Sequence, residues 1–132
     1  MSKSYKNGIS LCMTADETAK IIKKSPTDSD RNITFDRENR PGVSALLTTA
    51  ALCSGRTEAD IAAEIGDGGG GTLKALVTEA VNDYFAPIRA HREELARDLD
   101  YVKDVLYEGN RKANEIANAT LGEVNEAMGM VY

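Results

Sequence analysis

Apolar side chains recur at helical spacing along most of this chain. One long run covers residues 72–95, where Leu73, Val77 and later members stand three or four positions apart on one face. A second long run, over residues 99–128, keeps the same period. The pattern predicts two long amphipathic helices that form an antiparallel hairpin joined near residue 98.

A shorter helix is predicted near the start of the chain. Apolar side chains alternate over residues 9–13, which indicates a loop or a short strand. Thr14 follows, with Glu17 three positions later, and this spacing is that of a capping box. We therefore expect a helix over residues 15–24, ended by the Ser-Pro that comes next.

Two further helices are predicted in the middle of the chain. Pro41 suits a first helical turn, and the apolar run after it ends at Gly55, so a helix is expected over residues 41–54. Thr57 is placed to cap a second helix that reaches residue 65. Together with the long hairpin, these segments predict an all-α helical bundle.

Two polar segments separate these helices. Residues 26–42 are predicted to form a long ordered surface loop, with a brief strand over residues 32–35. Residues 66–71 read Gly-Asp-Gly-Gly-Gly-Gly and are interpreted as a flexible connector. A phosphate-cradling loop is the alternative, although the Gly-Lys-Ser/Thr of a P-loop is absent from this segment.

Composition supports helices and one core. The chain has 132 residues, 42% of them hydrophobic and 28% charged, with 5% aromatic residues and no tryptophan. A core must therefore come from Ala, Leu, Ile and Val, which suits helices better than sheets. No apolar run approaches the roughly 20 residues of a membrane span, and the polar start does not resemble a signal peptide. We expect a cytoplasmic protein.

The charge argues against a general nucleic-acid binder, because the net charge is −5. A local basic cluster at Arg89, Arg92 and Arg97 is interpreted as a solvated face balanced by nearby acids, with contact to RNA phosphates as the alternative. His91 lies on the apolar stripe and is predicted to be half-buried and hydrogen-bonded rather than catalytic.

No metal site is predicted. Cys12 and Cys53 are the only cysteines, and the single histidine cannot complete a zinc site with them. Two reduced thiols are expected, with a disulfide as the alternative.

The first seven residues carry the candidate chemistry. Lys3 offers a compact positive charge, and Ser2 and Ser4 on either side offer hydroxyl donors, a set that suits phosphate groups. A solvated terminal tail is the alternative, since lysine and serine are common in such tails.

Five stretches together resemble one family. "MSKSYKNGISL" is similar to the KMSKS signature of class I aminoacyl-tRNA synthetases, in the form seen in bacterial tryptophanyl-tRNA synthetases. Four later stretches support the same family, and the resemblance covers essentially the whole chain. They are "PTDS", "RPGVSALL", "GTLKALVTEAVNDYFAPIR" and "VLYEGNRKANEIANATLGEVNEAMGM".

The resemblance implies the roles of the first residues. Such enzymes react tryptophan with ATP, in the presence of magnesium, to give tryptophanyl-adenylate and pyrophosphate, and then transfer tryptophan to its tRNA. Lys3 matches the second signature lysine and is implied to be catalytic, by stabilising charge on the triphosphate. Ser2 and Ser4 match the signature serines and, with Lys3, are implied to bind the ATP phosphates. Residues 1–14 would be the KMSKS-loop segment of the catalytic domain, and residues 15–132 a helical domain that binds the anticodon of tryptophan tRNA.

The departures from the family limit this expectation. The first signature lysine, the Rossmann domain and the tryptophan pocket would all precede Met1, so the chain resembles a C-terminal fragment whose catalytic domain is missing. Alone it is expected to bind no ATP and to be inactive. A non-catalytic helical interaction or regulatory module derived from a synthetase is the alternative, and formation of a homodimer is left open.

Overall fold

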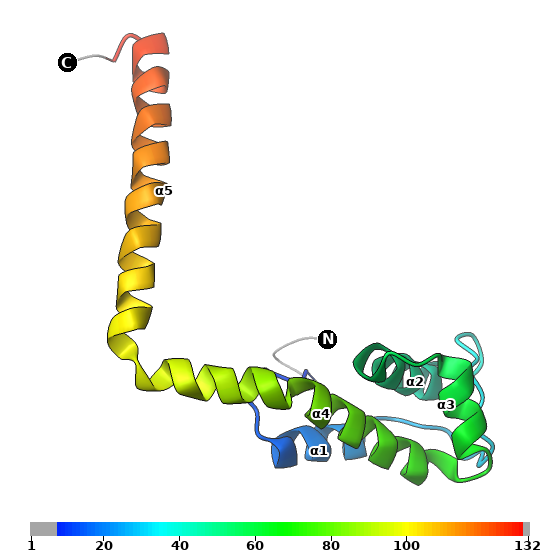
Figure 1. The fold of residues 1–132 in the computed structure, drawn as a ribbon. Coiled ribbons are helices and arrows are strands. Elements are labelled where there is room, and N and C mark those ends of the chain that lie inside the picture. Colours follow the sequence, from blue (N-terminus) through cyan, green and yellow to red (C-terminus); the bar gives the residue numbers. More distant parts are fainter. Residues whose placement is uncertain (1–7, 131–132) are drawn as a thin grey trace. The chain divides into compact units, whose positions relative to one another are not determined.

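The protein is described by a computed structural model that covers residues 8–130 (Figure 1). Every regular element in this range is a helix, which confirms the predicted all-α class with two long helices. The chain divides into two compact units, Met1–Ala90 and His91–Tyr132, called unit 1 and unit 2 below. The helices are α1 (Ala15–Lys24), α2 (Pro41–Ser54), α3 (Glu58–Ile65), α4 (Gly69–Arg97) and α5 (Leu99–Ala127).

The first helix has the predicted bounds. The Thr14 hydroxyl accepts a hydrogen bond from the backbone N–H of Glu17 at 3.2 Å, and the Glu17 carboxylate accepts one from the N–H of Thr14 at 2.8 Å. This reciprocal pair satisfies two backbone donors that a helix start leaves without partners. The segment before it, from Gly8 to Met13, contains a turn and no strand.

Helices α2 and α3 also have the predicted bounds and pack against each other. Pro41 stands in the first turn of α2, and Gly55 ends that helix with a φ of 71°, a left-handed conformation that glycine adopts without strain. The Thr57 hydroxyl accepts the N–H of Asp60 at 3.1 Å and so caps α3.

The core lies in unit 1, between α1, α2, α3 and the first half of α4. Its side chains are aliphatic, as the composition predicts. The largest fully buried ones include Leu47 on α2, Ile61 on α3, and Leu73 and Val77 on α4. Ile22 on α1 is buried with them. Burying each such side chain contributes about 1.5–3 kcal/mol, so these contacts hold the four helices together.

The glycine-rich segment is not the flexible connector that was expected. Helix α4 already begins at Gly69, three residues before the predicted start. The N–H of Gly69 donates to the carbonyl of Arg31 at 3.0 Å, and the carbonyl of Gly66 accepts the N–H of Ile33 at 2.7 Å. Glycine is needed at position 69, where φ is 79°. The segment is thus fixed to the polar loop of unit 1.

That polar loop, residues 25–40, is ordered but forms no strand, so the predicted strand over residues 32–35 is wrong. The side chain of Ile33 is buried in the core and anchors the middle of the loop. Phe35 is 40% exposed, and the guanidinium of Arg37 lies 5.4 Å from the centre of its ring. A buried anchor and side-chain hydrogen bonds therefore order this loop without a ladder partner.

Unit 2 contains the end of α4 and all of α5. Asp98 caps α5, since its carboxylate accepts the N–H of Tyr101 at 3.0 Å. The helix continues through Gly109 and ends before Gly129, whose φ is 66°. It is therefore one unbroken helix, and none of its residues is buried. Between residues 8 and 130, no helix has both the length and the apolar character to cross a membrane.

Candidate functional site

The predicted ATP-contacting residues, Ser2, Lys3 and Ser4, lie outside the described residues. Ile9, the second residue that the structure describes, packs its side chain against the core of unit 1. The chain that follows the predicted signature is therefore tied to the helical core by an apolar contact.

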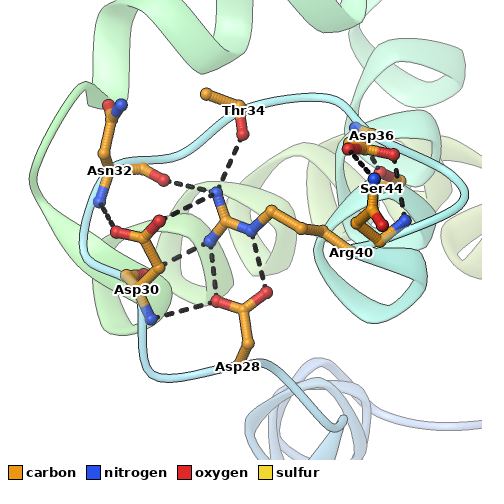
Figure 2. A network of polar contacts seen from close by, with 8 residues as sticks. Asp28, Asp30, Asn32, Thr34, Asp36, Arg40 and Ser44 are labelled. Atoms are coloured by element: carbon orange, nitrogen blue, oxygen red, sulfur yellow. Dashed lines mark hydrogen bonds and ion pairs between the residues drawn. The ribbon is translucent and has the colours of Figure 1, made fainter.

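The most connected polar group of unit 1 is Arg40, immediately before α2 (Figure 2). Its Nε and Nη2 donate to the two carboxylate oxygens of Asp28, at 2.8 and 2.7 Å. Only 11% of the Arg40 side chain is exposed, so this paired geometry is shielded from water. Bidentate arginine–carboxylate pairs are among the strong and directional hydrogen-bonded contacts in proteins.

The remaining donors of Arg40 hold the polar loop. Nη1 donates to the carbonyl of Asn32 and to the hydroxyl of Thr34 at 2.9 Å, and Nη2 also reaches the carbonyl of Asp30 at 3.3 Å. One guanidinium thus gathers four loop residues, as Figure 2 shows. "PTDS" and "RPGVSALL", which are two of the stretches that carry the family resemblance, meet in this network.

The same two stretches also approach through their backbones. A Cβ atom placed on Gly42 would lie 2.4 Å from the carbonyl oxygen of Pro26. That distance is below any van der Waals contact, so only glycine allows α2 to lie this close to the start of the loop. The need for glycine after Pro41 thus comes from packing.

Asp36 closes the other end of the loop. Its carboxylate accepts the N–H groups of Glu38 and Asn39, each at 3.0 Å, and its own N–H donates to the Ser44 hydroxyl at 2.9 Å. The Asn39 hydrogen bonds hold the pKa of Asp36 below its usual range. In the same way the guanidinium of Arg40 lowers the pKa of Asp28, and both carboxylates stay ionised well below neutral pH.

This Arg40 network orders the loop and is not itself arranged for catalysis. The contacts of Arg40 described above are all to groups of the loop that it holds, and the two carboxylates with lowered pKa values are strong acids that make poor general bases. Its function is to fix the shape of unit 1 between α1 and α2.

The three arginines of the predicted basic cluster belong to different units, with Arg89 in unit 1 and Arg92 and Arg97 in unit 2. Arg89 is half-buried in unit 1, where its guanidinium donates to Thr18 and to Asn82, both at 2.9 Å. It holds α4 to α1 and is not free to meet RNA phosphates. The prediction that His91 is half-buried is wrong, because its side chain is 68% exposed and its ring nitrogen lies 3.4 Å from the Glu94 carboxylate.

A basic surface that the sequence analysis missed lies between α1 and α4. Two lysines from these helices line a hollow of about 510 Å³, called the lysine hollow below. Spacing along the chain does not reveal it, because 51 positions separate Lys23 from Lys74. The hollow is lined by Ala19, Lys23, Gly71, Lys74, Ala75, Thr78 and Glu79.

An apolar hollow of about 410 Å³ opens beside Ile9. Its walls come from α1, α2 and α4 and include Ile21, Leu46, Val81 and Phe85. Leu52 on its edge is 76% exposed, which is unusual for a leucine beside so much apolar surface.

Comparison with known proteins shows which family this chain is similar to. Residues 1–86 match the family model described as tRNA synthetases class I (W and Y). A tryptophan–tRNA ligase of Nostoc is 38% identical over 132 residues, which are 98% of this chain and 39% of the relative. One from Thermosynechococcus vestitus is 39% identical over 98% of this chain and 40% of its own length. The chain thus spans about two fifths of the curated relatives it matches.

Proposed function

Because the chain belongs to the tryptophan and tyrosine branch of the class I tRNA synthetases, we propose that it is the C-terminal part of a tryptophan–tRNA ligase. The observation that carries the proposal is the match of 98% of the chain to the tryptophan–tRNA ligases of Nostoc and Thermosynechococcus vestitus. In this role residues 1–14 form the ATP loop and residues 15–132 bind tryptophan tRNA. We propose that the protein acts in the cytoplasm.

Ser2, Lys3 and Ser4 are the residues that act on ATP in this proposal. The Lys3 ammonium neutralises negative charge that develops on the triphosphate, and the hydroxyls of Ser2 and Ser4 donate hydrogen bonds to phosphate oxygens. Magnesium bound with ATP supplies further neutralisation. Reactions at phosphate groups depend on positioning and charge more than on covalent catalysis. One lysine that neutralises charge is therefore expected to raise the rate of tryptophan activation strongly.

The partner of this chain is a catalytic domain equivalent to the remaining three fifths of the relatives' length. The apolar hollow beside Ile9, with the exposed Leu52, is suited to being covered by such a domain. Covering Leu52 removes apolar surface from water, which stabilises the assembled enzyme.

The test is an activity assay in two forms. The chain alone is expected to show no tryptophan-dependent exchange of pyrophosphate into ATP. A hybrid in which the upstream part of the Thermosynechococcus vestitus ligase is joined to Met1 is expected to show it. Exchange by the isolated chain, or a folded hybrid without exchange, would contradict the proposal.

A second candidate function is a non-catalytic module that associates with a copy of itself. It is favoured by the exposed apolar side chains of α5, such as Leu99, Leu106 and Ile116, on a helix that buries no residue. Sedimentation equilibrium of the full chain separates the candidates. A stable dimer that dissociates on Leu106→Glu substitution, together with an inactive hybrid, supports the module.

A further inference from the structure

Helix α5 and the lysine hollow differ in how their lysines are paired. On α5, Lys103 pairs with Asp100 at 3.2 Å, Lys112 with Glu108 at 3.5 Å, and Arg111 with Glu108 at 2.8 Å. In the lysine hollow, by contrast, neither Lys23 nor Lys74 forms an ion pair with any carboxylate of residues 8–130. Their positive charges are therefore available to a ligand.

The hollow holds one of these lysines in place. Lys74 on α4 is half-buried, and its ammonium donates to the carbonyl of Lys23 at 3.3 Å. An ammonium has three N–H donors, so two remain for another acceptor. Lys23 itself is exposed in the last turn of α1, and Lys20 lies one turn earlier on the same side. The three ammonium groups belong to two helices of a single unit.

The other lining residues leave the hollow open to a bulky polyanion. Ala19, Gly71 and Ala75 have small side chains, and a Cβ placed on Gly71 would meet no atom within 4 Å. The one acidic lining residue is Glu79, against the two lining lysines, so the hollow is positive on balance. This stands out in a chain whose net charge is −5.

We propose that the lysine hollow binds the phosphodiester backbone of a structured RNA. The inference rests on the tRNA-binding role proposed above and assigns that role to a surface. Lysine side chains contact phosphates as point charges without reading sequence, and the lining has no aromatic ring on which a base could stack. The hollow therefore positions the RNA, and recognition of bases takes place elsewhere.

The experiment measures binding of the full chain to fluorescently labelled tryptophan tRNA by anisotropy, at several salt concentrations. The variants are Lys23→Gln, Lys74→Gln and the double variant, and the matched control is Lys103→Gln, whose lysine is paired on α5. Each lost phosphate contact is expected to weaken binding about tenfold and to reduce the slope of log K against log salt by about one. Circular dichroism verifies folding, and Lys23→Gln changes a side chain that is exposed.

The outcomes separate this inference from the function on which it rests. Weaker binding and a smaller salt slope for the hollow variants, with Lys103→Gln unchanged, support the lysine hollow. If all variants bind the tRNA as tightly as the wild type, the lysine hollow is not the RNA-binding surface. The tRNA-binding role of the chain then still stands. If the wild-type chain does not bind the tRNA even at low salt, the tRNA-binding role fails and the hollow fails with it.

Discussion

Helices α4 and α5 have the same length, 29 residues each, and both carry an apolar stripe, yet they differ in what they bury. Helix α4 buries Leu73, Val77 and Val81 in the core of unit 1. Helix α5 buries nothing, and Leu106 in the middle of its stripe is 61% exposed. An amphipathic period thus predicts a helix and its apolar face, but it does not say what covers that face.

The polar side chains differ in the same way. In unit 1, Arg40 binds groups that are up to 12 positions away and joins separate segments. In unit 2, Arg111 pairs with Glu108 and Glu115, which are three and four positions away on its own helix. Pairs of this kind stabilise a helix by a few tenths of a kcal/mol and do not join elements. Unit 1 is held by long-range contacts and α5 by local ones.

The largest expected effect comes from truncating one leucine in each helix. Leu73→Ala should lower the free energy of unfolding by about 2–5 kcal/mol, because a fully buried side chain is replaced by a cavity. Leu106→Ala on α5 should change it by roughly 0.5 kcal/mol or less. Urea denaturation followed by circular dichroism measures both. Equal losses would show that α5 is covered as α4 is.

The next effect comes from one glycine in each unit. Gly42→Ala should destabilise by about 1–3 kcal/mol, because the new methyl group meets the Pro26 carbonyl and α2 must shift. Gly122→Ala, inside α5 with no atom within 4 Å of its Cβ position, should instead stabilise the helix by up to about 1 kcal/mol. The same denaturation experiment applies, and a neutral Gly42→Ala variant would refute the close approach.

The smallest expected effect is a dependence on pH. The pKa of Asp28 is lowered in the folded protein from an ordinary value of 3.8, mainly by its hydrogen bonds with Arg40. A lowered folded-state pKa means that this stabilisation is complete above the unfolded pKa and is lost as pH falls through the folded pKa. The stability difference between wild type and Arg40→Gln should therefore shrink as pH is lowered below about 4. Arg111→Gln on α5 is the local counterpart, and its effect should shrink in the same direction, because the hydrogen bond from Arg111 holds the pKa of Glu108 below its ordinary value.

If the stability difference between wild type and Arg40→Gln instead stays constant between pH 6 and pH 2, Arg40 does not stabilise the fold through the charge of Asp28. The hydrogen bonds from Arg40 to the Asn32 carbonyl and the Thr34 hydroxyl do not titrate, and they would then account for the whole effect.

Local rules predicted the first three helices with their observed ends, because their signals lie within a few residues: the Thr14–Glu17 capping box, Pro41 and Gly55 around α2, and Thr57 before α3. The early start of α4 was not predictable, since Gly69 is held by the carbonyl of Arg31, 38 positions away. No periodicity in the sequence reports such a contact.

The candidate site shows the same limit. The ATP-contacting role of Ser2, Lys3 and Ser4 stays a prediction that rests on adjacent residues of the sequence, whereas the lysine hollow depends on a contact between helices that are distant in sequence. The pairing of Asp28 with Arg40 could have been suspected only from opposite charges at the two ends of one polar loop.

We propose that this chain supplies the ATP loop of a tryptophan–tRNA ligase, and substitution of Lys3 gives the sharpest test of that role. The measurement is tryptophan-dependent pyrophosphate exchange by the hybrid that joins the upstream part of the Thermosynechococcus vestitus ligase to Met1. Lys3→Ala should slow exchange by roughly 100- to 1,000-fold, the usual effect of losing one donor to a transition-state charge, with folding unchanged. Exchange at the wild-type rate in the Lys3→Ala hybrid would contradict the account.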